Sequence, residues 1–389
     1  MKFIRPFLKT ILVLFSIILI ACISLYLTGN AHLIKAVRST YLVGKTGPSI
    51  NDYLKFENRI IAKGNPIPWN LSNQQLKIKD SLITKAKNWE TVAFLVSQKN
   101  KIIYEKYWDS YSKESLTNSF SMAKTFTGLA IGACIQDGLI KSVNDPVALY
   151  LDEFNTPDKK NISIKDLLTM SSGIDFGESY GDPFGFMAKA YYGREIYQLT
   201  LSKPQQFKPG KQWKYQGGNT LVLSFIVEKV SGKTLSEYFS EKFWKPIGAS
   251  EDALWTYAEE DGKERAYCCF YSNARDFAKI GQFLLDSAKI NGKSIVDSTF
   301  YNQMIKPVNI PDENGKTIDY YGYQIWLGQY KNKSFYYARG ILGQYIVVIP
   351  ELEIVFVRLG HKRDKTRNVE VPKDLYLYFD MVFDLINNK

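Results

Sequence analysis

The sequence predicts an α+β fold in which an antiparallel sheet is flanked by helices and accompanied by a helical lobe. Two strand-like segments come early, at residues 91–97 and 102–108, and enclose a polar turn. Helical patterns fill the middle of the chain, and further strand-like segments with one closing helix come last. The early hairpin and the late strands can therefore share one sheet, with the helical middle as a second lobe.

The amino-acid composition is that of a globular protein and excludes several kinds of site. Of the 389 residues, 45% are hydrophobic and 23% are charged, which excludes a mostly disordered chain. His32 and His361 are the only histidines, which excludes a zinc site built on several of them. A Ser-His-Asp triad would have to use His361, which we expect at the surface.

Four cysteines are too few and too scattered for a disulfide framework or a cysteine-rich zinc fold. Cys134 lies in an apolar segment and is expected in the core. The adjacent Cys268 and Cys269 either form a reactive dithiol or are buried as small hydrophobic side chains, and we favour burial.

The N-terminus carries an apolar segment long enough to span a bilayer. Three basic residues precede an uncharged run of 19 residues, 10–28, and a spanning helix needs about 20 apolar residues. We therefore predict an uncleaved signal anchor at residues 1–30, with the rest of the chain on the extracytoplasmic (periplasmic) side. The alternative is a lipid anchor at Cys22, which the apolar residues after that cysteine disfavour.

After this anchor we expect a linker and lead-in at residues 31–75 and one large domain at residues 76–389. Glycines and prolines interrupt any hydrophobic period in the linker. Apolar spacing predicts a helix within residues 72–89. Residues 121–136 are apolar nearly all round, which predicts a buried helix that stops at Asp137-Gly138.

The remaining elements follow from the same patterns. Helical spacing occurs at residues 164–169, 220–230, 235–243 and 274–287. Strand-like segments occur at residues 321–327, 344–349 and 354–359, and an aromatic-rich helix is expected at residues 374–386. No internal repeat is visible.

The net charge of +11 comes from 50 basic and 39 acidic residues. These residues are dispersed and form no long basic block, so the charge favours a surface beside an anionic membrane over nucleic-acid binding. The chain also lacks a G-x-S-x-G nucleophile elbow, a phosphate-binding P-loop and a dinucleotide G-x-G-x-x-G motif. We therefore predict no nucleic-acid partner, no cofactor and no metal.

The buried helix predicted at residues 121–136 opens with an S-x-x-K pattern, from Ser121 to Lys124. Positions i and i+3 lie on one helix face, so the lysine amine can reach the serine hydroxyl. The helix N-terminus favours the negative charge that develops on the serine oxygen. Burial disfavours the charged form of a lysine, so Lys124 can serve as the base in place of a histidine. The alternative is that Ser121 caps the helix and Lys124 lies on the surface. A second S-x-x-K at residues 110–113 lies in a polar turn, and we interpret it as a chance match.

Five segments of the chain resemble, in order, the serine β-lactamase and penicillin-binding-protein superfamily. The branch they resemble is the class C-like group of esterases and nylon-oligomer (6-aminohexanoate) hydrolases. The segments are SFSMAKTFTGLAIGACIQDGLIKSVNDPVALYL, ISIKDLLTMSSGI, FKPGKQWKYQGGNTLVLSFIVEKVSG, CCFYSNARDFAKIGQFLL and YYARGILGQYIVVIPELEIVFVRLG. The resemblance covers roughly residues 85–385 and implies a β-lactamase/transpeptidase-like fold and a serine hydrolase.

The resemblance implies a role for each matching residue. Ser121 matches the acylated nucleophile and Lys124 matches its general base. Tyr215 matches the tyrosine of a Tyr-x-Asn element, whose phenol shuttles a proton to the leaving group; its alternative is one more packing aromatic. Gly217 replaces the asparagine of that element, which removes an amide that helps to bind substrate.

A third element borders the site in this family, and Arg339, Gly340 and Ile341 match it. The backbone N–H groups of Ser121 and Ile341 would form the oxyanion hole. Arg339-Gly340 replaces Lys-Thr-Gly, which removes groups that hold a β-lactam carboxylate, and Leu342 stands where nylon-oligomer hydrolases have a histidine. These departures bear against penicillin hydrolysis more than against acyl transfer. Arg339 either binds a substrate carboxylate or pairs with a structural acid.

The sequence thus predicts a membrane-anchored serine hydrolase that acts through an acyl-enzyme on a small ester or amide. Two alternatives stay open. One is a cell-wall D,D-carboxypeptidase or a β-lactamase, and the other is a catalytically silent penicillin-binding-like sensor on the same fold. The sequence predicts neither the identity of the substrate nor the oligomeric state.

Overall fold

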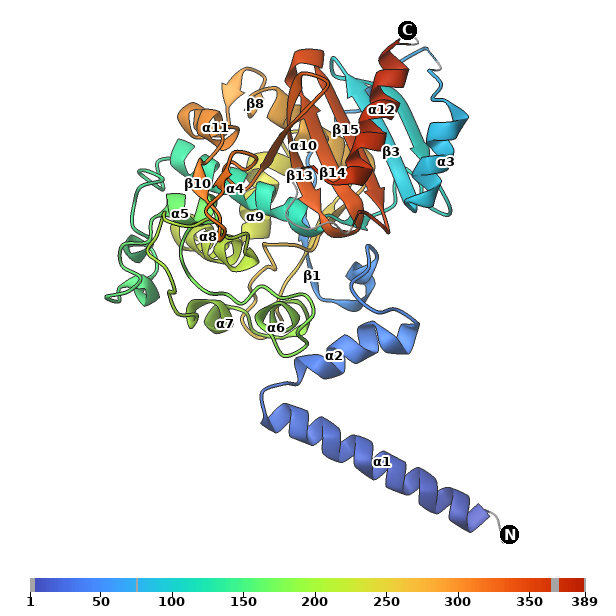
Figure 1. Ribbon diagram of the computed structural model, residues 1–389, viewed down its shortest axis with the longest axis vertical. Helices are drawn as coiled ribbons and strands as arrows, with labels where there is room; N and C mark the ends of the chain where they lie inside the picture. The colour runs from blue at the N-terminus through green and yellow to red at the C-terminus, as the bar shows by residue number, and fades with distance from the viewer. Residues whose placement is uncertain (1–3, 75, 365–370, 388–389) are drawn as a thin grey trace.

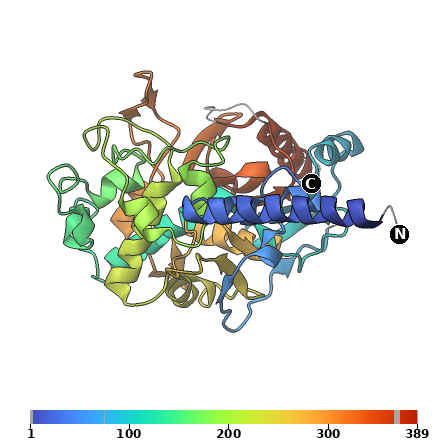
Figure 2. The ribbon, with the colours of Figure 1, turned by 90° about the horizontal axis from the view of Figure 1, so that it is seen from below.

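The computed structural model describes residues 4–74, 76–364 and 371–387. The apolar N-terminal segment forms one long helix, α1 (Ile4–Leu27), which projects from the lower side of the molecule in Figure 1 and lies in front of it in Figure 2, where the molecule is seen from below. Its part from Pro6 to Leu27 is long and apolar enough to cross a membrane. A short helix, α2 (His32–Ser39), follows and packs against α6 (Phe186–Tyr192).

The early hairpin and the late strands share one seven-stranded sheet, as predicted (Figure 1). Strand β15 (Ile354–Gly360) pairs antiparallel with β3 (Thr91–Gln98), which joins the two ends of the chain in the centre of the sheet. The strand order is β12-β13-β14-β15-β3-β4-β2. The other strands are β2 (Asn70–Leu71), β4 (Lys101–Tyr107), β12 (Trp326–Tyr330), β13 (Lys333–Gly340) and β14 (Gln344–Ile349).

Helices cover both faces of this sheet. Helix α10 (Ala274–Leu285) packs on β14, β15 and β3, whereas α3 (Asp80–Asn88) and α12 (Lys373–Asn387) pack together on the other face (Figure 1). Alternate residues of β15 therefore enter two different apolar cores. Burial on both faces explains why the strand reads as a continuous apolar run in the sequence.

The helical lobe is built around α4 (Ala123–Gln136) and α8 (Gly217–Ser231), which pack on each other. Helix α4 is buried over most of its length, as its apolar composition predicts. It ends before Gly138, which adopts the left-handed backbone region at φ +74° that favours glycine. Helix α9 (Leu235–Phe239) continues into a π-helical turn, Ser240–Trp244, which covers the helix predicted at residues 235–243.

A second, four-stranded sheet includes the chain just before Ser121, and the sequence did not predict this sheet. Its order is β1-β6-β7-β5. Strand β1 (Asn58–Ile61) comes from the stretch expected to be a linker, so that stretch carries structure that pairs with the rest of the chain. The other strands are β5 (Thr117–Asn118), β6 (Ala253–Thr256) and β7 (Phe270–Ser272).

Other differences from the prediction concern boundaries and short elements. Strand β12 begins at Trp326 rather than at residue 321, because Tyr321 forms only an isolated bridge with Trp326. Strand β13 was not among the predicted strands. The remaining helices are α5 (Ile164–Leu168), α7 (Tyr197–Leu201) and α11 (Ser298–Met304), and the remaining strands are β8 (Lys289–Ile290), β9 (Lys293–Ser294), β10 (Ile310–Pro311) and β11 (Thr317–Ile318).

Three of the single-residue expectations have clear outcomes. Cys134 is buried in the core, as expected. Cys268 and Cys269 are buried but joined by a disulfide, so describing them as small hydrophobic side chains was incomplete. His361 is half-buried against the hydroxyl of Tyr111 at 3.2 Å, so its expected surface position was wrong, and burial lowers its pKa.

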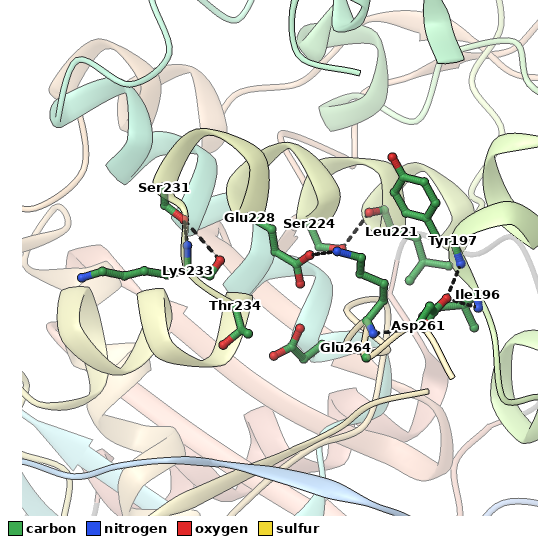
Figure 3. A network of polar contacts seen from close by, with 12 residues as sticks. Ile196, Tyr197, Leu221, Ser224, Glu228, Ser231, Lys233, Thr234, Asp261 and Glu264 are labelled. Carbon is green, nitrogen blue, oxygen red and sulfur yellow. Dashed lines mark hydrogen bonds and ion pairs between the residues drawn. The ribbon is translucent and has the colours of Figure 1, made fainter. Parts of the chain in front are cut away.

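A partly buried polar network joins α8 to the segment before Tyr267 (Figure 3). Glu228 accepts a hydrogen bond from Lys263, and Glu264 pairs with Arg59 at 3.0 Å. Burial, with the adjacent Glu264 carboxylate, raises the pKa of Glu228 to about 8. A proton on Glu228 also supplies a donor for the buried Oε2 of Glu264, which has no other partner within the described residues.

Candidate active site

Ser121 is presented by a sharp turn between β5 and α4. The turn is a 3-10 helix, η3 (Phe120–Met122). The N–H of Ser119 donates to Phe270 O at 2.7 Å, and the N–H of Phe120 donates to Asn118 Oδ1 at 2.8 Å. Phe120 has φ +44°, a strained conformation for a residue with a side chain. These bonds hold the strained turn and leave Ser121 half-buried at the start of α4.

Lys124 Nζ lies 3.0 Å from Ser121 Oγ, on the same face of the helix. The side chain is 1% exposed, so Lys124 is not the surface lysine of the alternative interpretation. Its Nζ also donates to the carbonyl oxygen of Tyr267 at 3.0 Å. No ion pair joins Lys124 to a carboxylate within the part of the chain that the structure describes.

The ring of Tyr215 also lies beside Lys124. Its ring centroid is 5.0 Å from Lys124 Nζ. The ring packs against Trp326 at 5.1 Å and Tyr321 at 6.0 Å between centroids. Tyr215 is therefore both a packing aromatic and a direct neighbour of Lys124, which places Ser121, Lys124 and Tyr215 in one small region.

Gly217 begins α8, and two residues that the sequence did not indicate contact it. Its N–H donates to the carboxylate of Glu178, whose other oxygen accepts from the hydroxyl of Tyr180 at 2.7 Å. A carboxylate at a helix N-terminus is electrostatically favourable. A Cβ added to Gly217 would lie 3.1 Å from the Cβ and Cδ2 of Tyr267, so the tyrosine occupies the space that a side chain would need.

The third predicted element forms the end of β13. A Cβ on Gly340 would lie 2.2 Å from the carbonyl oxygen of Ser119, so only glycine allows β13 to approach the turn that holds Ser121 this closely. The guanidinium carbon of Arg339 lies 3.5 Å from the ring centroid of Trp326. Arg339 and Tyr215 therefore both contact the ring of Trp326. Ile341 follows directly and is half-buried.

The structure thus brings together side chains and backbone that are far apart in the sequence. Tyr267, Glu178 and Trp326 border the site and were not predicted. Tyr267 contributes a backbone carbonyl to Lys124, which no residue-type pattern can reveal. Glu178 precedes Gly217 by many residues, so only the folded chain shows that it lies at the start of α8. His361, the one histidine available for a triad, contacts Tyr111 instead.

Comparisons with known proteins give a matching family model and several similar proteins. The family model described as Beta-lactamase matches residues 80–378. A 6-aminohexanoate-dimer hydrolase of Paenarthrobacter ureafaciens is 26% identical over 55% of this chain and 57% of its own length. An uncharacterised protein of Alkalihalophilus pseudofirmus is 24% identical over 67% of this chain and 80% of its own length.

Solved structures show the same fold. A Bacillus anthracis protein provisionally assigned as a 6-aminohexanoate-dimer hydrolase superposes with a TM-score of 0.71, at 22% identity, over 86% of this chain and 91% of its own. A family VIII carboxylesterase superposes with a TM-score of 0.61, at 16% identity, over 84% of this chain and 99% of its own. The predicted β-lactamase-like α+β fold is therefore confirmed.

Proposed function

Because the chain belongs to the beta-lactamase family, we propose that it is a membrane-anchored serine hydrolase that forms an acyl-enzyme on ester or amide substrates. The observation that carries this proposal is the buried Lys124 Nζ, 3.0 Å from Ser121 Oγ at the start of α4. A similar protein is named a 6-aminohexanoate-dimer hydrolase, and a carboxylesterase has the same fold, which supports the same reaction class.

In the proposed reaction, Lys124 takes the hydroxyl proton as Ser121 Oγ attacks the substrate carbonyl. The tetrahedral intermediate collapses when the bond to the leaving oxygen or nitrogen breaks. Tyr215, beside Lys124, passes the proton to that leaving group. Water then attacks the acyl-serine, releases the acid and restores the Ser121 hydroxyl.

The end of β13 supports the binding part of the proposal. Ile341 follows Gly340, whose missing side chain permits contact with the Ser119 carbonyl. Its N–H, with that of Ser121, is proposed as the oxyanion hole, where each donor is worth about 3–4 kcal/mol of transition-state stabilisation. Arg339, stacked on Trp326, is the proposed partner for a substrate carboxylate, with Gly217 and Gly340 lining the binding site.

Helix α1 is the proposed anchor, with the hydrolase domain on the extracytoplasmic side. Sedimentation of the full chain with membranes, and its release only by detergent, would support this part of the proposal. Recovery of the full chain in the soluble fraction after cell lysis would contradict it. Mass spectrometry of the mature N-terminus separates an intact helix from a chain that begins with a lipid-modified Cys22.

The test of the reaction is intact-protein mass spectrometry of the full chain in detergent after treatment with a fluorophosphonate. We expect a single adduct on Ser121, lost in Ser121→Ala and formed more slowly in Lys124→Ala. Hydrolysis of a short-chain p-nitrophenyl ester should fall in the same two variants. Full turnover by Ser121→Ala would refute the nucleophile.

The same experiment separates the alternatives. A long-lived penicillin adduct, or rapid hydrolysis of penicillin, would favour a cell-wall carboxypeptidase or a β-lactamase. The absence of every adduct in a folded protein would favour a catalytically silent sensor with a penicillin-binding-like site.

A further inference from the structure

We propose that Tyr267 is the positioning residue for Lys124, and that the absence of a side chain at Gly217 makes room for it. This inference rests on the proposed roles of Ser121 and Lys124. Tyr267 belongs to no sequence motif, and it lies 143 positions along the chain from Lys124, which it contacts.

Tyr267 contacts the Lys124 amine in two ways. Its backbone carbonyl accepts a hydrogen bond from Nζ at 3.0 Å, and its ring centroid lies 5.5 Å from the same atom. A lysine side chain loses rotamer entropy when it is held in one geometry. The contacts of Tyr267 therefore favour the one rotamer in which Nζ reaches Ser121 Oγ.

The ring is itself held against the start of α8. Tyr267 is 3% exposed, and its Cβ, Cγ and Cδ2 lie 3.1–3.2 Å from the position of a Cβ on Gly217. A side chain at residue 217 would displace the ring from its present position beside Lys124. The hydroxyl of Tyr267 has no hydrogen-bond partner within the described residues, so the ring and the carbonyl carry the contacts. Burial raises the pKa of this phenol, which keeps it neutral beside the amine.

The backbone around Tyr267 is fixed to the helix that carries Lys124. Thr127 Oγ1, one turn along α4 from Lys124, donates to the carbonyl of Ala266 at 3.3 Å. Two consecutive carbonyls, those of Ala266 and Tyr267, therefore dock on one face of α4. On the other side, Trp255 Nε1 donates to the carbonyl of Cys268 at 3.0 Å, and Cys268 is bonded to Cys269. These contacts on both sides fix the position of the Tyr267 carbonyl along the axis of α4.

A double-mutant cycle tests whether Tyr267 acts through Lys124. The measurement is the second-order rate of Ser121 labelling by a fluorophosphonate in the full chain, in detergent, for the unsubstituted protein, Tyr267→Leu, Lys124→Ala and the double variant. A misplacement of about 1 Å can cost roughly a hundredfold in rate, so we expect Tyr267→Leu to slow labelling by about ten- to a hundredfold. In the Lys124→Ala background the same substitution should change the rate by less than about twofold.

Equal slowing in both backgrounds would overturn the proposal, since it would show a structural effect independent of Lys124. An unchanged rate for Tyr267→Leu would overturn it as well. Both variants keep the backbone carbonyl, but Tyr267→Phe also keeps the ring and should label within about twofold of the unsubstituted rate. Tyr238→Leu is the matched control, because Tyr238 is buried in the same lobe and its hydroxyl bonds to Asp137 away from the site.

A second perturbation covers the case in which Tyr267→Leu does not fold. Gly217→Ala removes no group and presses a Cβ against the Tyr267 ring, and it should show the same non-additivity with Lys124→Ala. Additive slowing by Gly217→Ala would overturn the proposal. If the unsubstituted chain is not labelled on Ser121 at all, the proposed function fails and this inference fails with it. Normal labelling with an additive cycle refutes the inference alone.

Discussion

Replacing Gly340 by alanine tests how closely β13 must approach the turn that holds Ser121. A Cβ at this position would lie 2.2 Å from the Ser119 carbonyl oxygen and 3.2 Å from the Cβ of Phe120. Carbon and carbonyl oxygen atoms in contact are normally about 3.3–3.6 Å apart. The strand and the turn must therefore separate by about 1 Å, because the obstructing atom belongs to the backbone and cannot rotate away.

This separation is expected to affect both stability and reactivity. Overpacking of this kind costs about 1–3 kcal/mol in the free energy of unfolding, which corresponds to a fall of several degrees in the melting temperature. A shift of about 1 Å between Ser121 and the N–H of Ile341 is expected to slow acylation by roughly a hundredfold. The rate of Ser121 acylation should therefore fall by more than the fraction of unfolded protein can explain.

Thermal melting by circular dichroism and the rate of fluorophosphonate labelling measure these two effects separately. Gly47→Ala is the matched control, because no atom lies within 4 Å of its added Cβ and its φ is not positive. A Gly340→Ala protein with an unchanged melting temperature would refute the packing argument. A less stable protein that labels at the normal rate would refute the position assigned to Ile341 in the site.

Three further predictions concern the rest of the domain. Arg265→Met should lower the free energy of unfolding by about 1–3 kcal/mol for each carbonyl left unsatisfied, measured by urea unfolding, because the buried guanidinium donates to the carbonyls of Ala190, Tyr257 and Gly193. The pKa of Glu228 is raised from 4.5 to about 8, so the folded chain keeps a proton that the unfolded chain releases. The free energy of unfolding should then fall as the pH rises from about 4.5 to 8, and a Glu228→Gln variant with the same slope would contradict this. Alkylation of the unfolded chain without reductant should modify Cys22 and Cys134 only, and four modified cysteines would contradict the Cys268–Cys269 disulfide.

Much of the fold was predictable because it depends on local patterns. Alternation of side chains and a polar turn identified the hairpin of β3 and β4, and an apolar run with a glycine stop identified α4. The apolar N-terminal run likewise identified α1. Helical periodicity also predicted that the side chains of Ser121 and Lys124 would meet, because three residues along a helix return to the same face.

Other parts of the site depend on contacts between distant segments. The sequence offers no signal that a carbonyl at Tyr267 would hold Lys124, since every residue has a carbonyl. It also offers no signal that β1 would enter a sheet from the expected linker, because a short strand is stabilised by its partner rather than by its own residues.

Local patterns in the amino-acid sequence were therefore enough to predict the β3–β4 hairpin, the late strands β14 and β15, the buried helix α4 and the serine–lysine pair at its start. Only the tertiary structure decided which backbone approaches that pair. Two such approaches leave no room for a Cβ on the glycine. At Gly340 the Cβ would collide with the Ser119 carbonyl oxygen, and at Gly217 it would press against the Tyr267 side chain. Such contacts depend on how distant segments pack at near-crystalline density, which local propensity and periodicity do not encode.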